Sequence, residues 1–429
     1  MNVSRLGGAC VVALLLVRLA IGQVQGISSL DELVQMALER NQDYLALKER
    51  VTEAQALTRQ AGLRPSPTLE VEAGVGAIGG SSGESEYSAA YFQTIERGGK
   101  REKRLTVAEK AVALAEAEIR ERERQLAFDI KSQAVSVLGQ ENKLASIRFM
   151  LVTNQDSYRL TTQRVELGDA APLEEQLLLS EVNRTQAQIT SAEAARDAGL
   201  VELQRIVGLS AVPRLDLAEG LRLGDHEPQL KELQAFALEH RSDLLTLKLL
   251  EAQAAAETSL ANAEGKRDLT ASARYTRSRS SFDQFGLSES GAIVPLRDTD
   301  NIITFGLSIP LFTKSRAQPA IDAAKARQSQ QSLRREQLER VIPLEVEAAY
   351  RRFVGARRSL ELLRTGVVEP SQKSLTVIRE AYRLGQLRLF DVLNEQRRLG
   401  DLQLSYIDAQ TDVGRALAEL ERAIGGNLP

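Results

Sequence analysis

The sequence has very few residues that could bind a metal or begin acid–base chemistry. Its 429 residues include one cysteine, Cys10, two histidines, His226 and His240, and no tryptophan. One cysteine excludes a disulfide framework, and two isolated histidines lack the spacing of a zinc site or a catalytic triad. We therefore expect no catalytic residue, no metal site and no cofactor.

An excess of positive charge is also missing. Lysine and arginine number 55 and aspartate and glutamate 58, a formal net charge of −3. This balance argues against binding to nucleic acid through bulk charge. The one GxGxxG match, Gly74–Gly79, is followed by Gly-Ser-Ser-Gly where a dinucleotide site needs a helix. We expect no nucleic-acid partner.

Long apolar runs are absent beyond the N-terminus. The apolar run Ala9–Ile21 is interrupted by Arg18 and ends in a small-x-small pattern at Gly22. It is too short to span a bilayer and is typical of a secretory signal, which we predict at residues 1–22. A second candidate cleavage site follows Gly26, and an uncleaved N-terminal anchor is the alternative.

The sequence does contain an internal duplication, in which similar residues recur in the same order. Leu30–Lys48 aligns without gaps with Leu230–Lys248, and Leu167-Gly168 recurs as Leu384-Gly385. The offsets, 200 and 217 residues, are nearly constant and far exceed the period of a solenoid repeat. We therefore predict a duplicated domain. Its parts would be a first repeat at 23–212, a linker at 213–228 and a second repeat at 229–429.

Each copy holds two stretches in which apolar and polar residues alternate, the pattern of a strand with one apolar face. These stretches are residues 69–77, 87–95, 269–276 and 303–311. They predict hairpins at about 68–96 and 268–311, the second containing a long polar loop at 278–301. Each stretch is about as long as a tilted membrane-crossing strand, roughly 9–11 residues. Alternation alone fits an ordinary hairpin on a soluble core equally well.

Four strands cannot close a barrel, because about eight are needed for the smallest filled one. A lipid-facing sheet with open edges is not tolerated in hydrocarbon. If these strands face lipid, several chains must share one barrel, and three chains would give twelve strands.

The rest of the sequence predicts long helices with apolar residues seven apart, the spacing of a coiled coil. The clearest runs are Leu105, Val112, Ile119 and Leu126 in the first copy, and Val392, Leu399, Tyr406, Val413 and Leu420 in the second. Carboxylates of these helices alternate with basic residues and are interpreted as surface groups. The predicted fold class is mainly α with a small β part.

The helix–hairpin–helix plan, present twice, resembles the TolC-like outer-membrane efflux proteins. Thr94–Arg101 resembles the family's strand-to-helix junction, usually Pro-Ile-x-x-Gly-Gly-Lys-Arg, with Thr94 in place of proline. Tyr382–Gly385 followed by Phe390–Leu393 resembles the family's periplasmic helix tip. The length and the junction are similar to the heavy-metal (Czc-type) branch. The junction residues are Gly98, Gly99, Lys100 and Arg101, with Pro310 at the matching place in the second copy.

The resemblance implies a homotrimer. Its twelve strands would form an outer-membrane β-barrel in contact with lipid, and its coiled-coil helices an α-barrel through the periplasm. It implies a passive exit duct of a tripartite efflux or type I secretion system, for small solutes or metal ions, working with a periplasmic adaptor and an inner-membrane pump. The alternative is a periplasmic coiled-coil adaptor or scaffold, but adaptors carry one helical hairpin and this chain has two symmetric copies.

The resemblance also assigns roles near the helix tips. Asp391 would line the periplasmic aperture, and Asn394 takes the place of a second acidic residue found in some members. Tyr382 and Arg388 lie where contacts locking helix to helix are expected. The adaptor-docking turns would hold Leu167, Gly168, Leu384 and Gly385, with Glu174 as the first-copy counterpart of Asp391.

Overall fold

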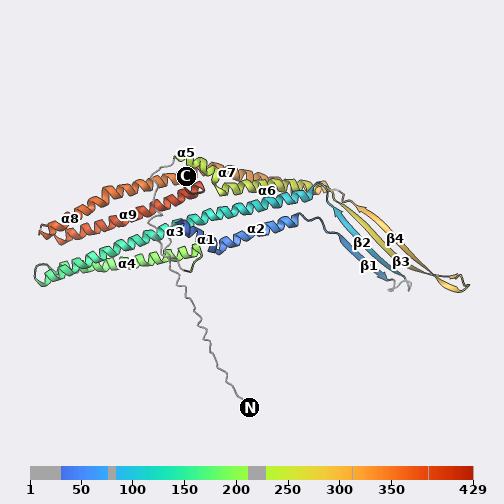
Figure 1. The fold of residues 1–429 in the computed structure, drawn as a ribbon, viewed down its shortest axis with the longest axis horizontal. Helices are drawn as coiled ribbons and strands as arrows, with labels where there is room; N and C mark the ends of the chain where they lie inside the picture. Colours follow the sequence, from blue (N-terminus) through green and yellow to red (C-terminus); the bar gives the residue numbers. More distant parts are fainter. Residues whose placement is uncertain (1–29, 76–83, 211–228, 312, 385, 429) are drawn as a thin grey trace, which may run out of the picture.

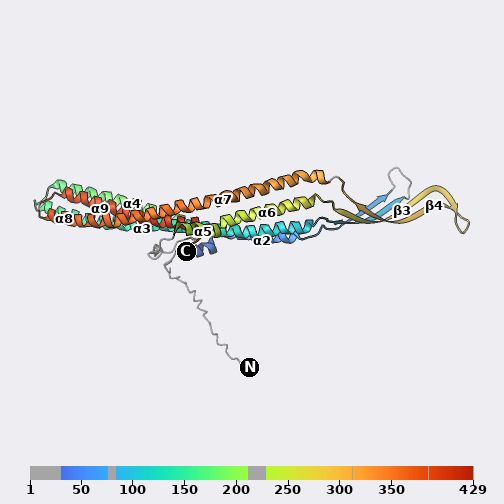
Figure 2. The same cartoon turned by 90° about the horizontal axis from the view of Figure 1, so that it is seen from above.

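The computed structural model describes residues 30–75, 84–210, 229–311, 313–384 and 386–428. The signal predicted at 1–22 and the linker predicted at 213–228 lie outside these residues. Within them the molecule is elongated, with a sheet at one end and the turns of two long helical hairpins at the other (Figure 1), and a quarter turn about the long axis shows the same elongated outline (Figure 2). In its described part, every helix is too polar or too short to pass through a bilayer.

The described elements follow the same order twice, with two short helices, two strands and two long helical arms in each copy. The first copy holds α1 (Leu30–Arg40), α2 (Gln42–Ala61), β1 (Thr68–Val75), β2 (Ser85–Ile95), α3 (Lys100–Glu166) and α4 (Pro172–Val207). The second holds α5 (Leu230–His240), α6 (Ser242–Glu264), β3 (Leu269–Leu287), β4 (Ile293–Ser308), α7 (Thr313–Leu363), a π-helical turn (Arg364–Val368), α8 (Glu369–Arg383) and α9 (Leu389–Ile424). The duplicated, mainly helical fold is confirmed.

Each copy builds its own core where its short helices meet its long ones. In the first copy Leu33 and Ala37 of α1 pack with Leu203 of α4 and with α3. In the second, Leu233 and Ala237 of α5 pack in the same way with α7 and α9. The buried residues of α9 include Val392, Leu399, Val413 and Leu420, so the predicted seven-residue seam is confirmed for these positions.

The long arms of the two copies differ by a π-helical turn. Helix α3 runs without a break through 67 residues, whereas a π-helical turn of 5 residues separates α7 from α8. The offset between the copies rises from 216 at Thr94 and Pro310 to 217 at Leu167 and Leu384. One extra residue in an α-helix is accommodated by a π-bulge. Residues 313–383, which hold α7, the turn and α8, are four more than the 67 of α3, so the turn accommodates part of this difference.

The strands form one antiparallel sheet in the order β1-β2-β3-β4. Strands β3 and β4 extend well beyond β1 and β2 (Figure 1). The prediction of a polar loop at 278–301 is wrong, because β3 continues to Leu287 and β4 begins at Ile293. Charged residues alternate with uncharged polar ones at Arg277–Ser280 and Asp298–Asn301, where no apolar face marks a strand. Pairing continues because backbone hydrogen bonds do not depend on an apolar face.

One face of the sheet is apolar and exposed, and the other is polar. The exposed face carries Leu69, Val71, Tyr87, Tyr91, Tyr275, Ile303, Phe305 and Leu307. On the opposite face Arg274 forms an ion pair with Glu72 (Nη1 to Oε2, 2.7 Å) and a hydrogen bond to the Ser88 hydroxyl. The Arg274 charge on the polar face is therefore paired, while the apolar face is left uncovered by the residues that the structure describes.

Candidate functional site at the hairpin ends

The junction between β2 and α3 adopts a backbone conformation that glycine permits. Gly98 and Gly99 have φ angles of +83° and +69°, a region that other residues rarely adopt. A Cβ at Gly98 would also lie 2.4 Å from Cδ of Lys266. The next residue, Lys100, is 8% exposed and bonds Asp268 (Nζ to Oδ2, 2.7 Å). Arg101 donates from Nε to the carbonyl of Gly62 at the end of α2.

Together these contacts join the end of β2, the start of β3, the end of α2 and the start of α3. Pro310, at the matching place after β4, is exposed. The junction therefore fixes how the sheet meets the helices in the first copy.

Replacing Lys100 with methionine should destabilise the junction by about 3 kcal/mol, because it leaves the Asp268 carboxylate without its buried partner. Lys100 is also the first residue of α3, where a cation is unfavourable unless an acid offsets it. Urea unfolding in detergent measures the change. Lys103→Met, at an exposed position of the same helix, should change stability by less than about 0.5 kcal/mol. Equal losses in both variants would contradict the assignment.

The turns that end the two hairpins expose leucine to solvent. Leu167, between α3 and α4, is 77% exposed, and Leu384, between α8 and α9, is 66% exposed. Gly168 has a φ of +80° and open space around it. Gly385 lies outside the described residues. Glu174, in the first turn of α4, is half-buried. Large exposed apolar side chains on a tight turn are a feature of surfaces that contact another protein.

Asp391 and Asn394 are both exposed near the start of α9. The Asp391 carboxylate accepts a hydrogen bond from the backbone N–H of Arg388 (3.1 Å) and so caps the N-terminus of the helix, as the acidic residue of a capping box does. Among the residues that the structure describes, the Arg388 side chain forms no hydrogen bond or ion pair with the other hairpin. Asp391 therefore has a local role in addition to the one that the resemblance implies.

Tyr382 connects the two hairpins. Its hydroxyl accepts a hydrogen bond from Nη1 of Arg164 on α3 (2.8 Å), and the same guanidinium lies 5.6 Å from the centre of the tyrosine ring. Close by, Leu178 of α4 packs against Leu389 and Leu393 of α9. The hairpin ends are thus joined by one cation–π contact and one small apolar cluster.

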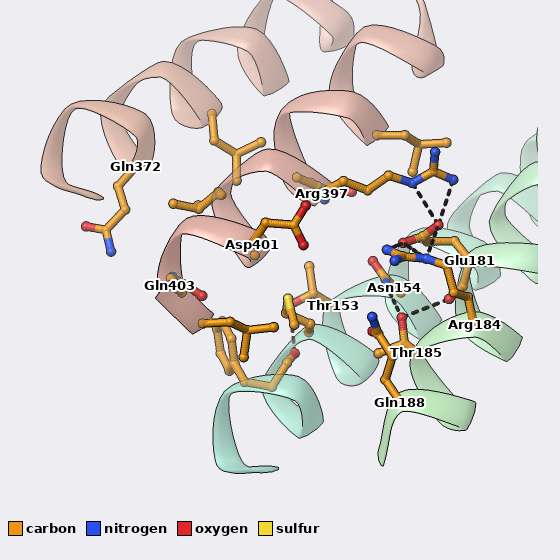
Figure 3. A pocket seen from close by; sticks show the side chains of 18 of the residues that line it. Thr153, Asn154, Glu181, Arg184, Thr185, Gln188, Gln372, Arg397, Asp401 and Gln403 are labelled. Carbon is orange, nitrogen blue, oxygen red and sulfur yellow. Dashed lines mark hydrogen bonds and ion pairs between the residues drawn. The ribbon is translucent and has the colours of Figure 1, made fainter. Parts of the chain in front are cut away.

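A buried carboxylate also links the two hairpins. Glu181 of α4 is 4% exposed and accepts hydrogen bonds from Arg397 of α9 (Nη2 to Oε2, 2.7 Å) and from Arg184 of its own helix. Figure 3 shows Arg397 reaching across to Glu181 with Arg184 beside it. A buried carboxylate with two guanidinium partners is held firmly, because separation would leave its charge unpaired.

Beside this ion pair lies a cavity of about 270 Å³ between the two hairpins. Its wall combines polar and apolar groups, among them Met150, Asn154, Gln396 and Asp401. The Gln396 Oε1 is buried and has no hydrogen-bond partner within the described residues. The hairpins are therefore incompletely packed beside the Glu181–Arg397 ion pair.

The sequence interpretation of helix carboxylates as surface groups is wrong for Glu181. The buried positions of α4 next to it are Leu178, Thr185 and Ile189, at seam spacings of three and four. Glu181 therefore occupies a seam position, and that spacing was the available signal. Its partner Arg397 lies 216 residues away along the chain, beyond the range of any periodicity.

Acid should weaken this link. Burial alone would raise the pKa of Glu181, but the hydrogen bonds and charges of Arg184 and Arg397 outweigh it and hold that pKa below the usual carboxyl range. The stabilisation is therefore complete above the ordinary glutamate pKa of about 4.3 and is lost as pH falls through the lowered value. We expect the stability of the helical arms towards urea to fall in the wild type as the pH is lowered through the pKa of Glu181. It should vary less with pH in Glu181→Gln, and identical pH profiles would contradict the assignment.

The comparisons with known proteins agree with this geometry. The model of a protein family described as outer membrane efflux protein matches residues 33–209 and 235–426. One matched range lies in each copy, and together they cover most of the chain. No protein with a curated description matches.

Solved structures share the fold over nearly the whole chain. CusC superposes with a TM-score of 0.75 at 18% identity, covering 93% of this chain and 92% of that one. A membrane protein from Pseudomonas aeruginosa gives 0.73 at 21% identity, with 93% and 90% covered. The outer membrane protein VceC from Vibrio cholerae gives 0.71 at 18% identity, with 93% and 96% covered. At these identities the likeness establishes the fold alone.

Proposed function

Because the chain belongs to the outer membrane efflux protein family, we propose that it works as a homotrimeric exit duct whose periplasmic end is held shut by links between its two helical hairpins. The duct is passive and carries small solutes or metal ions outward. The chain performs no catalytic step and needs no cofactor. A periplasmic adaptor and an inner-membrane pump supply the coupling to energy. Membership of this family favours the duct over an adaptor or scaffold.

The sheet supports the trimer. Its four strands leave β1 and β4 as edges and one face exposed and apolar, with Phe305 80% exposed. Open strand edges are not tolerated in hydrocarbon, so the edges must pair with those of other copies. Three copies bring twelve strands, enough to close a barrel around the polar face that carries Arg274 and Glu72.

Contacts at the ends of the helical hairpins are consistent with a gate at the periplasmic end. In a trimer the exposed Asp391 carboxylates would form a ring of three negative charges, and such a ring favours cations over anions. Glu181–Arg397 and Arg164–Tyr382 hold α8 and α9 against α3 and α4. Opening would require these links to break. The cavity beside them and the π-helical turn at the start of α8 are the places where the movement costs least.

The exposed turns support an adaptor-docking role for Leu167, Gly168 and Leu384, with Gly385 beyond the described residues. A photoreactive side chain placed at Leu167 or Leu384 in cells should crosslink to a periplasmic adaptor. The same group at Leu57, exposed on α2, should not. Crosslinks of equal yield at all three positions would contradict docking at the turns.

The single observation that carries the proposal is the exposed apolar face of a four-stranded sheet that cannot close alone. The experiment is to extract the full chain with detergent, measure its mass and insert it into a planar bilayer. A trimer that conducts ions supports the proposal. A chain that dissolves without detergent as a single subunit would overturn it.

A further inference from the structure

Three arginines lie on the exposed face of the sheet, where its apolar band ends. Arg277 is paired in register with Tyr87 and with Asn301, Arg279 with Ser85 and Thr299, and Ser281 with Arg297. Because side chains alternate between faces, these arginines share the face of Tyr275 and Phe305. All three side chains are exposed.

Three acidic residues of this region lie on the other face. Glu86, Asp298 and Asp300 are each adjacent in sequence to a residue of the arginine-bearing face and so point away from it. Within the described residues, Arg277, Arg279 and Arg297 make no ion pair and no side-chain hydrogen bond. Arg274, on the polar face of the same strand, bonds Glu72 and Ser88. The sheet thus provides partners for Arg274 on its polar face, whereas the three arginines on the exposed face have none within the described residues.

The position along the strand matches a membrane boundary. Arg277 and Arg279 are eight and ten residues beyond Leu269, where β3 begins. At about 3.3 Å per residue and a tilt near 40°, this is roughly 20–25 Å, close to the height of the apolar band of an outer-membrane barrel. Tyr87 and Tyr275 lie beside and just below them, as aromatic girdle residues do.

We propose that Arg277, Arg279 and Arg297 form a binding site for the phosphate groups of an anionic lipid in the outer leaflet. The site rests on the proposed membrane orientation of the sheet. A guanidinium binds phosphate through paired N–H donors, and no carboxylate whose side chain the structure describes pairs with these three arginines. The apolar side chains below contact the acyl chains of the same lipid. A trimer would carry three such sites.

The test uses the full-length trimer in a neutral detergent, titrated with lipid A that carries both phosphates. The wild type should bind it, and R277Q/R279Q should bind at least about tenfold more weakly, the loss expected for one charge-assisted bond. R277K/R279K should recover part of the affinity, because lysine keeps the charge but not the fork of donors. The matched control is R327Q/R334Q, which removes two exposed arginines from α7, and its affinity should equal the wild type.

Two further titrations identify the ligand. Lipid A without its phosphates should bind weakly and equally to wild type and R277Q/R279Q. Inorganic phosphate at the same phosphate concentration should not displace lipid A, and displacement would overturn the lipid as the ligand. Conductance of each variant in planar bilayers separates the two proposals. A wild type that does not conduct counts against the exit duct, whereas conducting variants with unchanged lipid A affinity would overturn the arginine site.

Discussion

Replacing Glu181 with glutamine should open the periplasmic end of the channel. The substitution keeps the size of the side chain but removes the negative charge that holds Arg184 and Arg397 together. Breaking a buried pair costs 3–5 kcal/mol, and both arginines are partly in solvent, so we expect a loss of about 2 kcal/mol. This shifts the ratio of open to closed channels roughly 30-fold. Single-channel recording in planar bilayers measures it as conductance and open time.

A matched control exists on the same helix. Glu193 of α4 pairs with Arg148 of α3 (2.6 Å), so both partners belong to one hairpin. Glu193→Gln should leave the conductance unchanged, although it also removes a Glu–Arg ion pair, one that is more exposed. Arg397→Gln breaks only the bond between hairpins and keeps Glu181–Arg184, and it should open the channel in the same direction but less. If Glu181→Gln conducts like Glu193→Gln, the link does not hold the gate.

Replacing Asp391 with asparagine should remove most of the preference for cations. In a trimer three carboxylates are lost at one narrow ring. If each contributes roughly 0.5–1 kcal/mol to holding a cation, as exposed ion pairs do, block by multivalent cations should weaken about tenfold to a hundredfold. Asparagine is chosen because its side-chain oxygen can still accept the hydrogen bond from the Arg388 N–H, so the start of α9 keeps its cap.

The comparison with other substitutions separates charge from helix capping. Asp391→Ala removes both the charge and the cap, and it should weaken cation block as Asp391→Asn does but also lower stability by about 1 kcal/mol. Asp169→Asn removes an exposed carboxylate from the other hairpin turn, and its ion preference should match the wild type. If Asp391→Asn leaves ion preference and cation block unchanged, Asp391 does not line the aperture.

The junction and the tips show how much of the site could be predicted. The unusual backbone conformation of the junction could be predicted from the sequence, because Gly98 and Gly99 occupy the two positions with positive φ angles. The exposed turn at Leu167 was visible as a repeated Leu-Gly pair. The partner of Lys100 was not, because Asp268 belongs to the second copy and reaches the junction only through the pairing of β2 with β3.

The sequence by itself determined the mainly helical class, the duplication and the strands with an apolar face. Apolar residues that recur every two or every seven positions, and motifs that recur at a nearly constant offset, can be read directly from the order of residues along the chain. Only the tertiary structure decided that β3 and β4 run on through the polar stretch, that Glu181 is buried and that Arg397 is its partner. Periodicity reports which side of its own element a residue occupies. It carries no information about which distant element covers that side, and the burial of a charge depends on that cover.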